Sequence, residues 1–225
     1  MMKRIFSTLT GLLLALSLSV TALAGILWVL GTSDEIMLPM MRHYAPSEST
    51  GLPDEEYPFM TGMITGYMSG KITYFSRQYA IYDVRYPFSD QELAHMDDCR
   101  ALFVLDKTVL IVAGVLSLAL LAAAILQRDR RVWRWCAIGF GAMIAMVALV
   151  AAAAIIDFDR LFVLFHRLSF TNDLWMLNPQ TDIIIRLMPT SFFMAYASIL
   201  GVSWLLLMAL MLTGAVILHK RGKKA

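Results

Sequence analysis

The pattern of apolar and polar positions divides the chain into four long apolar stretches and two polar segments. The apolar stretches cover residues of about 8–30, 104–126, 136–156 and 191–218, and they are almost free of charge. Crossing a bilayer takes roughly 20 apolar residues, and in lipid a single segment satisfies its backbone only as a helix. We therefore predict an all-α membrane protein with four transmembrane helices. The first should remain uncleaved, because its apolar run continues to Leu30, past the small residues at 22–24 that resemble a signal-peptide cleavage site.

The two polar segments, 31–100 and 157–190, together hold about 100 residues, enough for a small cap on the helix ends but thin for an independent domain. Residues 57–70 have helical spacing of apolar side chains and end at Gly70, which suits a helix C-cap. Residues 72–86 are rich in Tyr, Ile, Phe and Val with partial alternation, which predicts a hairpin. We expect one integral membrane domain, 1–225, with a small α/β cap.

Charge predicts the orientation of the four spans. The two chain ends and the short loop between the second and third spans hold 10 basic residues and 1 acid, while the rest of the chain holds 9 basic and 16 acidic residues. An excess of Lys and Arg marks the cytoplasmic side. Both termini should therefore lie in the cytoplasm and the cap should lie on the outer side of the cell membrane. The basic ends suit contact with anionic lipid and not with nucleic acid. We also expect the protein to be a monomer.

The polar segment before the second span contains a histidine on a well-defined helix. Ser89-Asp90-Gln91-Glu92 forms a capping box, so a helix should begin at Asp90 and continue into the span. On that helix Glu92 and Asp98 each lie about one turn from His95. A carboxylate beside an imidazole fixes its tautomer and favours its charged form.

A second histidine, His166, follows the third span among aromatic residues typical of the lipid headgroup layer. Both histidines therefore fall on the outer side, at the depth of lipid ester bonds, and together form a candidate catalytic pair. For a single loop histidine a structural role is the usual one, and His43 and His219 are assigned to that class.

Other chemistry is less well supported by the sequence. Glu92-x-x-His95 has the spacing of a di-iron bundle motif, but that site needs two copies and two further carboxylates, and no H-E-x-x-H occurs. A methionine cluster near His43 suits soft metals, although 16 methionines make a chance cluster the simpler interpretation. No G-x-S-x-G elbow is present. We predict no metal and no soluble cofactor, and leave metal binding as the lesser alternative.

Two segments resemble the bacterial lipoprotein intramolecular transacylase family. They are Phe88-Ser89-x-x-Glu92-x-x-His95-Met96-x-Asp98 and Phe165-His166-x-x-x-Phe170-x-Asn172-Asp173-x-Trp175-x-Leu177-Asn178-Pro179-x-Thr181-Asp182. The four-span layout agrees over the whole chain. The first segment departs from the family after Asp98, where Cys99-Arg100 replaces a Val-Lys pair.

The resemblance implies an enzyme with two catalytic histidines, His95 and His166, at the junction of cap and membrane. It implies a diacylglyceryl lipoprotein substrate, whose sn-2 acyl chain moves to the α-amine of its own N-terminal cysteine to give the lyso form. One histidine would act as base and the other as acid or oxyanion donor, in either assignment. The expected orienting or binding residues are Glu92, Asp98, Tyr67, Asn172, Asp173, Trp175 and Asn178.

Two other functions remain open at this point. The chain could bind lipoprotein or lipid without catalysis, or transfer acyl groups on free phospholipid. A single catalytic site predicts that the two imidazoles lie within about 8 Å of each other, close enough to exchange protons directly or through water.

Overall fold

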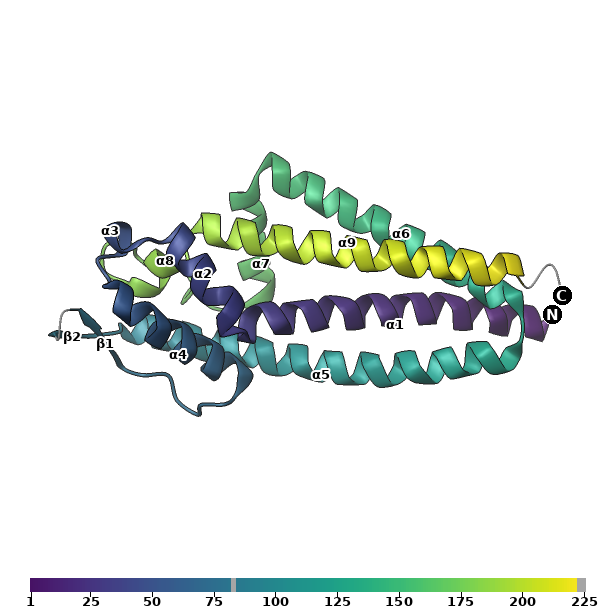
Figure 1. The fold of residues 1–225 in the computed structure, drawn as a ribbon, viewed down its shortest axis with the longest axis horizontal. Helices are drawn as coiled ribbons and strands as arrows, with labels where there is room; N and C mark the ends of the chain where they lie inside the picture. The colour runs from purple at the N-terminus through teal and green to yellow at the C-terminus, as the bar shows by residue number, and fades with distance from the viewer. Residues whose placement is uncertain (82–83, 222–225) are drawn as a thin grey trace. The chain divides into compact units, whose positions relative to one another are not determined.

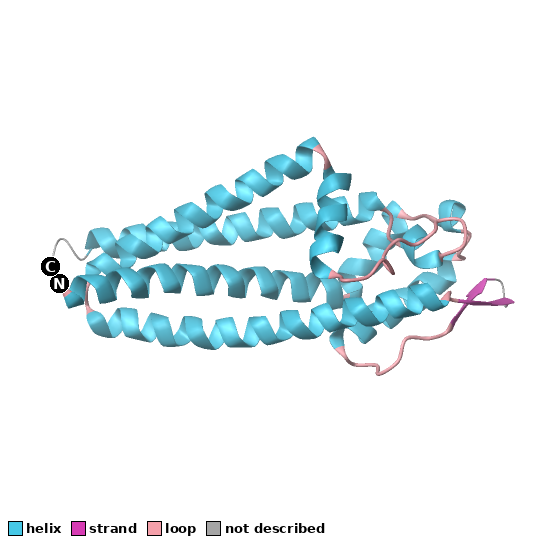
Figure 2. Ribbon diagram, turned by 180° about the vertical axis from the view of Figure 1, so that it is seen from behind, coloured by secondary structure: helices cyan, strands magenta, loops and turns pink. Residues whose placement is uncertain are grey.

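The computed structural model describes residues 1–81 and 84–221, and the tip of the predicted hairpin (82–83) and the basic residues Lys223 and Lys224 lie outside them. Helices dominate, with one short pair of strands (Figures 1 and 2). In chain order the elements are α1 (Met2–Thr32), α2 (Asp34–Tyr44), α3 (Ser47–Thr50), η1 (Asp54–Glu56), α4 (Tyr57–Ser69), β1 (Gln78–Ile81), β2 (Val84–Pro87), α5 (Asp90–Gln127), α6 (Arg130–Ile156), α7 (Phe158–Ser169), α8 (Ile183–Leu187) and α9 (Thr190–Arg221).

Four helices, α1, α5, α6 and α9, are long and apolar enough to cross a membrane, and each contains one predicted span. The prediction of a four-span helical membrane protein is confirmed. α5 is 38 residues long and begins at Asp90, where the capping box placed it. The Glu92 carboxylate accepts the backbone N–H of Ser89 at 2.8 Å, and the Ser89 hydroxyl accepts that of Glu92 at 3.1 Å.

The chain forms two compact units, of which unit 1 contains residues 1–26, 107–156 and 199–225, and unit 2 contains residues 27–106 and 157–198. In unit 1, α1 and α6 approach closely at small residues. A Cβ placed on Gly11 would lie 2.3 Å from the Val132 carbonyl oxygen and 2.8 Å from the Trp135 Cβ, and a Cβ on Gly139 would lie 2.6 Å from that of Ala15. Helices in lipid associate through close packing at such positions.

The close approach makes Gly11 sensitive to a single added methyl group. We expect Gly11→Ala to destabilise the protein by about 1–3 kcal/mol, because the new Cβ meets backbone that cannot rotate away. Gly141→Ala on α6 is the matched control, since open space surrounds that position. Thermal unfolding in detergent should show a lower midpoint for Gly11→Ala alone, and equal midpoints for the two variants would contradict the packing.

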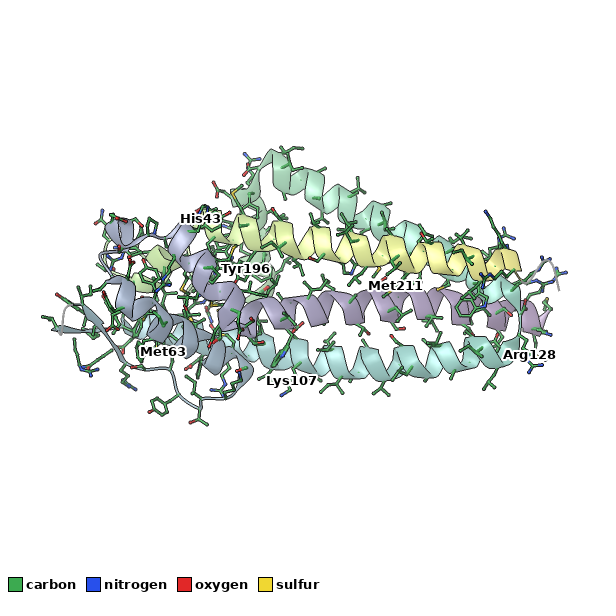
Figure 3. All side chains as sticks on the ribbon, in the orientation of Figure 1. His43, Met63, Lys107, Arg128, Tyr196 and Met211 are labelled. Atoms are coloured by element: carbon green, nitrogen blue, oxygen red, sulfur yellow. The ribbon has the colours of Figure 1, made fainter. Side chains whose placement is uncertain are left out.

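The short turn between α5 and α6 is fixed by polar contacts within unit 1. Arg128 adopts a positive φ of 48°, and Figure 3 shows it at this turn. The neighbouring Asp129 carboxylate accepts the Ser7 hydroxyl at 2.7 Å and the backbone N–H of Arg131 at 3.0 Å. The first of these bonds joins the turn to the second turn of α1.

Unit 2 holds its own core, built largely from the α2–α4 segment, the strands, and the start of α5. Its fully buried members include Met41, Leu52, Tyr57, Met60, Met96, Ile183, Leu187 and Phe192. β1 and β2 pair antiparallel, so the α/β character is confirmed, but the strands begin only at Gln78. Residues 72–77 are not in a strand, and Arg100 binds the backbone carbonyls of Ile72 and Thr73 at 3.2 and 3.1 Å.

Candidate functional site

The two histidines lie together in unit 2. His95 is in the second turn of α5 and His166 is near the end of α7, and both side chains are buried. Their ring centroids are 6.3 Å apart and their planes differ by 34°. The separation is within the limit of about 8 Å that a single site requires.

A backbone carbonyl fixes the tautomer of His166. Its Nδ1 lies 2.7 Å from the carbonyl oxygen of Phe162, one turn earlier on α7. A carbonyl oxygen only accepts, so Nδ1 carries the proton and, in the neutral ring, Nε2 keeps its lone pair. Burial lowers the pKa of His166, and the hydrogen bond to Phe162 opposes that shift in part. The resting imidazole is therefore neutral with a basic Nε2.

Aromatic rings surround His166. The centroids of Phe162, Trp175, Phe165 and Phe170 lie 4.2, 4.8, 5.3 and 5.7 Å from that of the imidazole. Such walls exclude water and strengthen electrostatic interactions inside. Trp175, one of the expected orienting or binding residues, lies among these rings.

His95 contacts Phe170 and a thiol. Phe170 meets His95 edge to face at 5.3 Å, so this one ring contacts both histidines. The Cys99 sulfur lies 3.5 Å from Nε2 and 4.0 Å from Nδ1 of His95. The thiol is therefore within hydrogen-bond reach of His95, and whether it donates or accepts depends on the tautomer of the ring.

Asn172 joins the two histidine-bearing segments. Its Nδ2 donates to the Asp98 carboxylate at 2.9 Å, and its backbone carbonyl accepts the Trp175 indole N–H at 3.1 Å. Burial lowers the pKa of His95 to about 4 and the nearby His166 adds to that shift, while the Asp98 carboxylate only partly opposes it, so the expectation of a charged His95 is not met. Trp175 packs on His166. The amide oxygen of Asn172 is also used, since it accepts the backbone N–H of Leu174. Asn172 is therefore placed to hold the site together.

Glu92 is committed to backbone groups. Its side chain is 1% exposed, and besides the Ser89 N–H it accepts the backbone N–H of Ile184 at 2.9 Å. Ile184 lies in the first turn of α8, whose own N-cap residue, Asp182, makes no side-chain cap. The Asp182 carboxylate turns back instead to the backbone N–H of Asn178 at 2.8 Å. Glu92 thus caps α5 and α8 at once.

Tyr67 belongs to a neighbouring cluster. Its hydroxyl donates to the Asp97 carboxylate, and the Arg100 guanidinium lies 4.4 Å above its ring. Burial raises the pKa of Tyr67, and the bond to Asp97 adds to that shift. Asp97 and Arg100 were not among the expected site residues, although both are charged and lie two and five residues after His95 on α5.

Two expected residues lie on exposed turns. Asn178 is exposed and closes the turn before α8, where its amide oxygen accepts the backbone N–H of Gln180 at 3.0 Å. Asp173 is exposed, and its carbonyl accepts the N–H of Met176. Within the described part of the chain, the ring contacts and hydrogen bonds of the histidines involve neither residue. No group of three metal-type ligands is found among the described residues.

These features define a multi-pass membrane protein with a buried two-histidine site. A family model for lipoprotein intramolecular transacylase Lit matches residues 8–193. The chain belongs to the Lit family.

Solved structures agree on the fold. The chain resembles the membrane integral lipoprotein intramolecular transacylase Lit from Bacillus cereus with a TM-score of 0.81 at 17% identity, covering 98% of this chain and 99% of that one. Two histidine variants of the Bacillus cereus protein also match. The arginine variant has a TM-score of 0.75 at 17% identity, covering 97% of this chain and 94% of that one. The alanine variant has a TM-score of 0.66 at 18% identity, covering 98% of this chain and 96% of that one. Comparison with curated protein sequences found no match.

Proposed function

We propose that this protein moves the sn-2 acyl chain of a diacylglyceryl lipoprotein to the α-amine of the same N-terminal cysteine. The observation that carries the proposal is the pair of buried imidazoles, with ring centroids 6.3 Å apart, in a chain of the Lit family. Because donor and acceptor belong to one substrate, holding them in an attack geometry supplies much of the rate. The Lys and Arg distribution supports a site at the outer face of a bacterial membrane, with both termini in the cytoplasm.

His166 is assigned as the base. Its proton is held on Nδ1 by the Phe162 carbonyl, so Nε2 is the atom that accepts a proton from the substrate ammonium. The freed amine attacks the sn-2 carbonyl carbon, a C–N bond forms and negative charge develops on the carbonyl oxygen. A neutral imidazole N–H of His95 is suited to donate to this oxygen or to the departing glycerol oxygen.

The protons balance in this scheme. The ammonium loses one proton to His166 before attack. His166 releases that proton to water and takes the second one from the attacking nitrogen as the C–O bond breaks, while His95 protonates the glycerol oxygen and is then reprotonated by His166. The products are an amide, a free sn-2 hydroxyl and one released proton. Asp98, beside His95 and bonded to Asn172, supplies negative charge that favours an ammonium in the site.

The reaction is tested with purified protein in vesicles and a synthetic diacylglyceryl lipopeptide that has a free N-terminal amine. The product is an isomer of the substrate, so fragmentation in the mass spectrometer must locate the acyl chain. An N-acyl lyso product is expected. A substrate left intact under conditions where the protein remains folded would contradict the proposal.

The fall of activity at low pH should report the protonation of His166. Its Nε2 works only when unprotonated, and burial lowers its pKa below the ordinary value near 6.5. Activity should therefore persist as the pH falls to 6.5 and decline only below it. The measurement is kcat/KM against pH, which reports the titrating groups of the unliganded enzyme. A midpoint of the acid limb above 6.5 would show that His166 is not the limiting base.

A further inference from the structure

The helix that carries His166 presents a row of apolar side chains that nothing in the mechanism above uses. Leu164, Phe165 and Leu168 on α7 are 50%, 54% and 79% exposed. With the half-buried Leu161 they recur at the three- and four-residue spacing of one helix face. We call these four residues the α7 apolar face. His166 and Phe162 lie on the inward side of the same helix.

The rest of α7 suits a helix that lies in the lipid–water interface. Arg160 and Arg167 are exposed, seven residues apart, and therefore lie together along one border of the apolar face. Basic side chains beside an exposed apolar row are typical of interfacial helices. Only Asp157 separates α7 from Ile156, the last residue of the membrane-spanning α6, so the chain enters α7 as it leaves the hydrocarbon.

Phe165 connects this face to the catalytic pair. It is more than half exposed, yet its ring lies 5.3 Å from that of His166 in edge-to-face contact. An apolar surface therefore runs from the outside of α7 to the imidazole. The reacting ester must reach Nε2 of His166 while its hydrocarbon chain stays out of water, and this surface provides such a path.

We propose that the α7 apolar face binds the sn-2 acyl chain of the lipoprotein substrate, so that α7 sets the preferred length of the chain that is transferred. The inference rests on the proposed function. The α7 apolar face holds the chain along Leu164 and Leu168, and Phe165 contacts it next to the ester. A face that merely rests in bulk lipid would hold the protein in the membrane without distinguishing one substrate chain from another.

Chain-length dependence tests the assignment. With lipopeptides carrying a palmitoyl or a butyryl chain at sn-2, Leu168→Ser should raise KM for the palmitoyl substrate about five- to tenfold, because the lost contact is apolar burial of a long chain. The butyryl substrate, too short to reach Leu168 one helical turn from Phe165, should keep its KM within about twofold, and kcat should change little for either. Ile155→Ser is the matched control, an exposed aliphatic residue at the end of α6 that should alter neither substrate.

A second measurement is independent of any variant's folding. A lipopeptide with a photoreactive diazirine near the middle of its sn-2 chain should cross-link the wild-type protein within residues 161–168, as peptide mapping would show. Equal KM changes for both chain lengths, or cross-links spread over α6 and α9 with none in α7, would overturn the assignment. Turnover of both substrates by the wild type would still support the transacylase function, so the two claims fail separately.

Discussion

Replacing His166 with glutamine should lower the rate of N-acyl product formation by about 10²–10⁴-fold, the range expected for loss of a positioned general base. The substitution removes the Nε2 lone pair that the Phe162 carbonyl orients through Nδ1. His43→Gln is the matched control, because His43 is an exposed residue of α2 whose ring packs against Tyr44. Turnover is measured in vesicles, with folding checked by thermal unfolding. Near-normal turnover of His166→Gln would remove His166 from the mechanism.

The partner histidine sharpens this result. His95→Gln should also reduce kcat strongly. The double variant should have a kcat only slightly below that of the less active single variant. Groups that act as a unit in one transition state are not additive when removed. Multiplicative losses would indicate that the two imidazoles, although their centroids are 6.3 Å apart, act in separate steps.

The second large effect is on stability. Glu92→Ala should lower the free energy of unfolding by about 2–4 kcal/mol, because it leaves the backbone N–H groups of Ser89 and Ile184 without their charged acceptor. Activity should fall with it, since the link between α5 and α8 holds the helix that carries His95. The check is the unfolding midpoint in detergent together with kcat.

Two companion variants separate this role from catalysis. Glu55→Ala, at an exposed carboxylate in η1, should leave the midpoint unchanged. Glu92→Gln retains one acceptor oxygen and should recover part of the stability. A Glu92→Ala protein of wild-type stability and no activity would mean that the carboxylate serves the reaction directly.

The four spans and the start of α5 could be predicted because their causes are local. Lipid imposes a helix on each long apolar run, and the capping box needs only Ser89 and Glu92, three residues apart. The hairpin was predicted too long, because residues 72–77 have strand-like composition but their carbonyls at Ile72 and Thr73 bind Arg100. The alternation of apolar and polar residues does not reveal that a distant side chain binds these carbonyls in place of a neighbouring strand.

The site could be predicted as a pair of histidines but not as a network. The second acceptor role of Glu92 is toward a backbone N–H 92 residues away, and every non-proline residue has such a group. The Asp98–Asn172 bond joins residues 74 positions apart, and Phe170 lies against both imidazoles only because α7 and α5 pack together. Sequence spacing carries no information on these contacts.

The most direct test of the central claim is a crossover experiment on the wild-type protein. Two lipopeptides are mixed in the same vesicles, one with an isotopically heavy sn-2 chain on a light peptide and the other with a light chain on a heavy peptide. Intramolecular transfer predicts that each N-acyl product keeps its own chain, with no heavy chain on heavy peptide. Crossed products, or acyl chains recovered on free phospholipid, would contradict transfer within one lipoprotein by the His95–His166 pair.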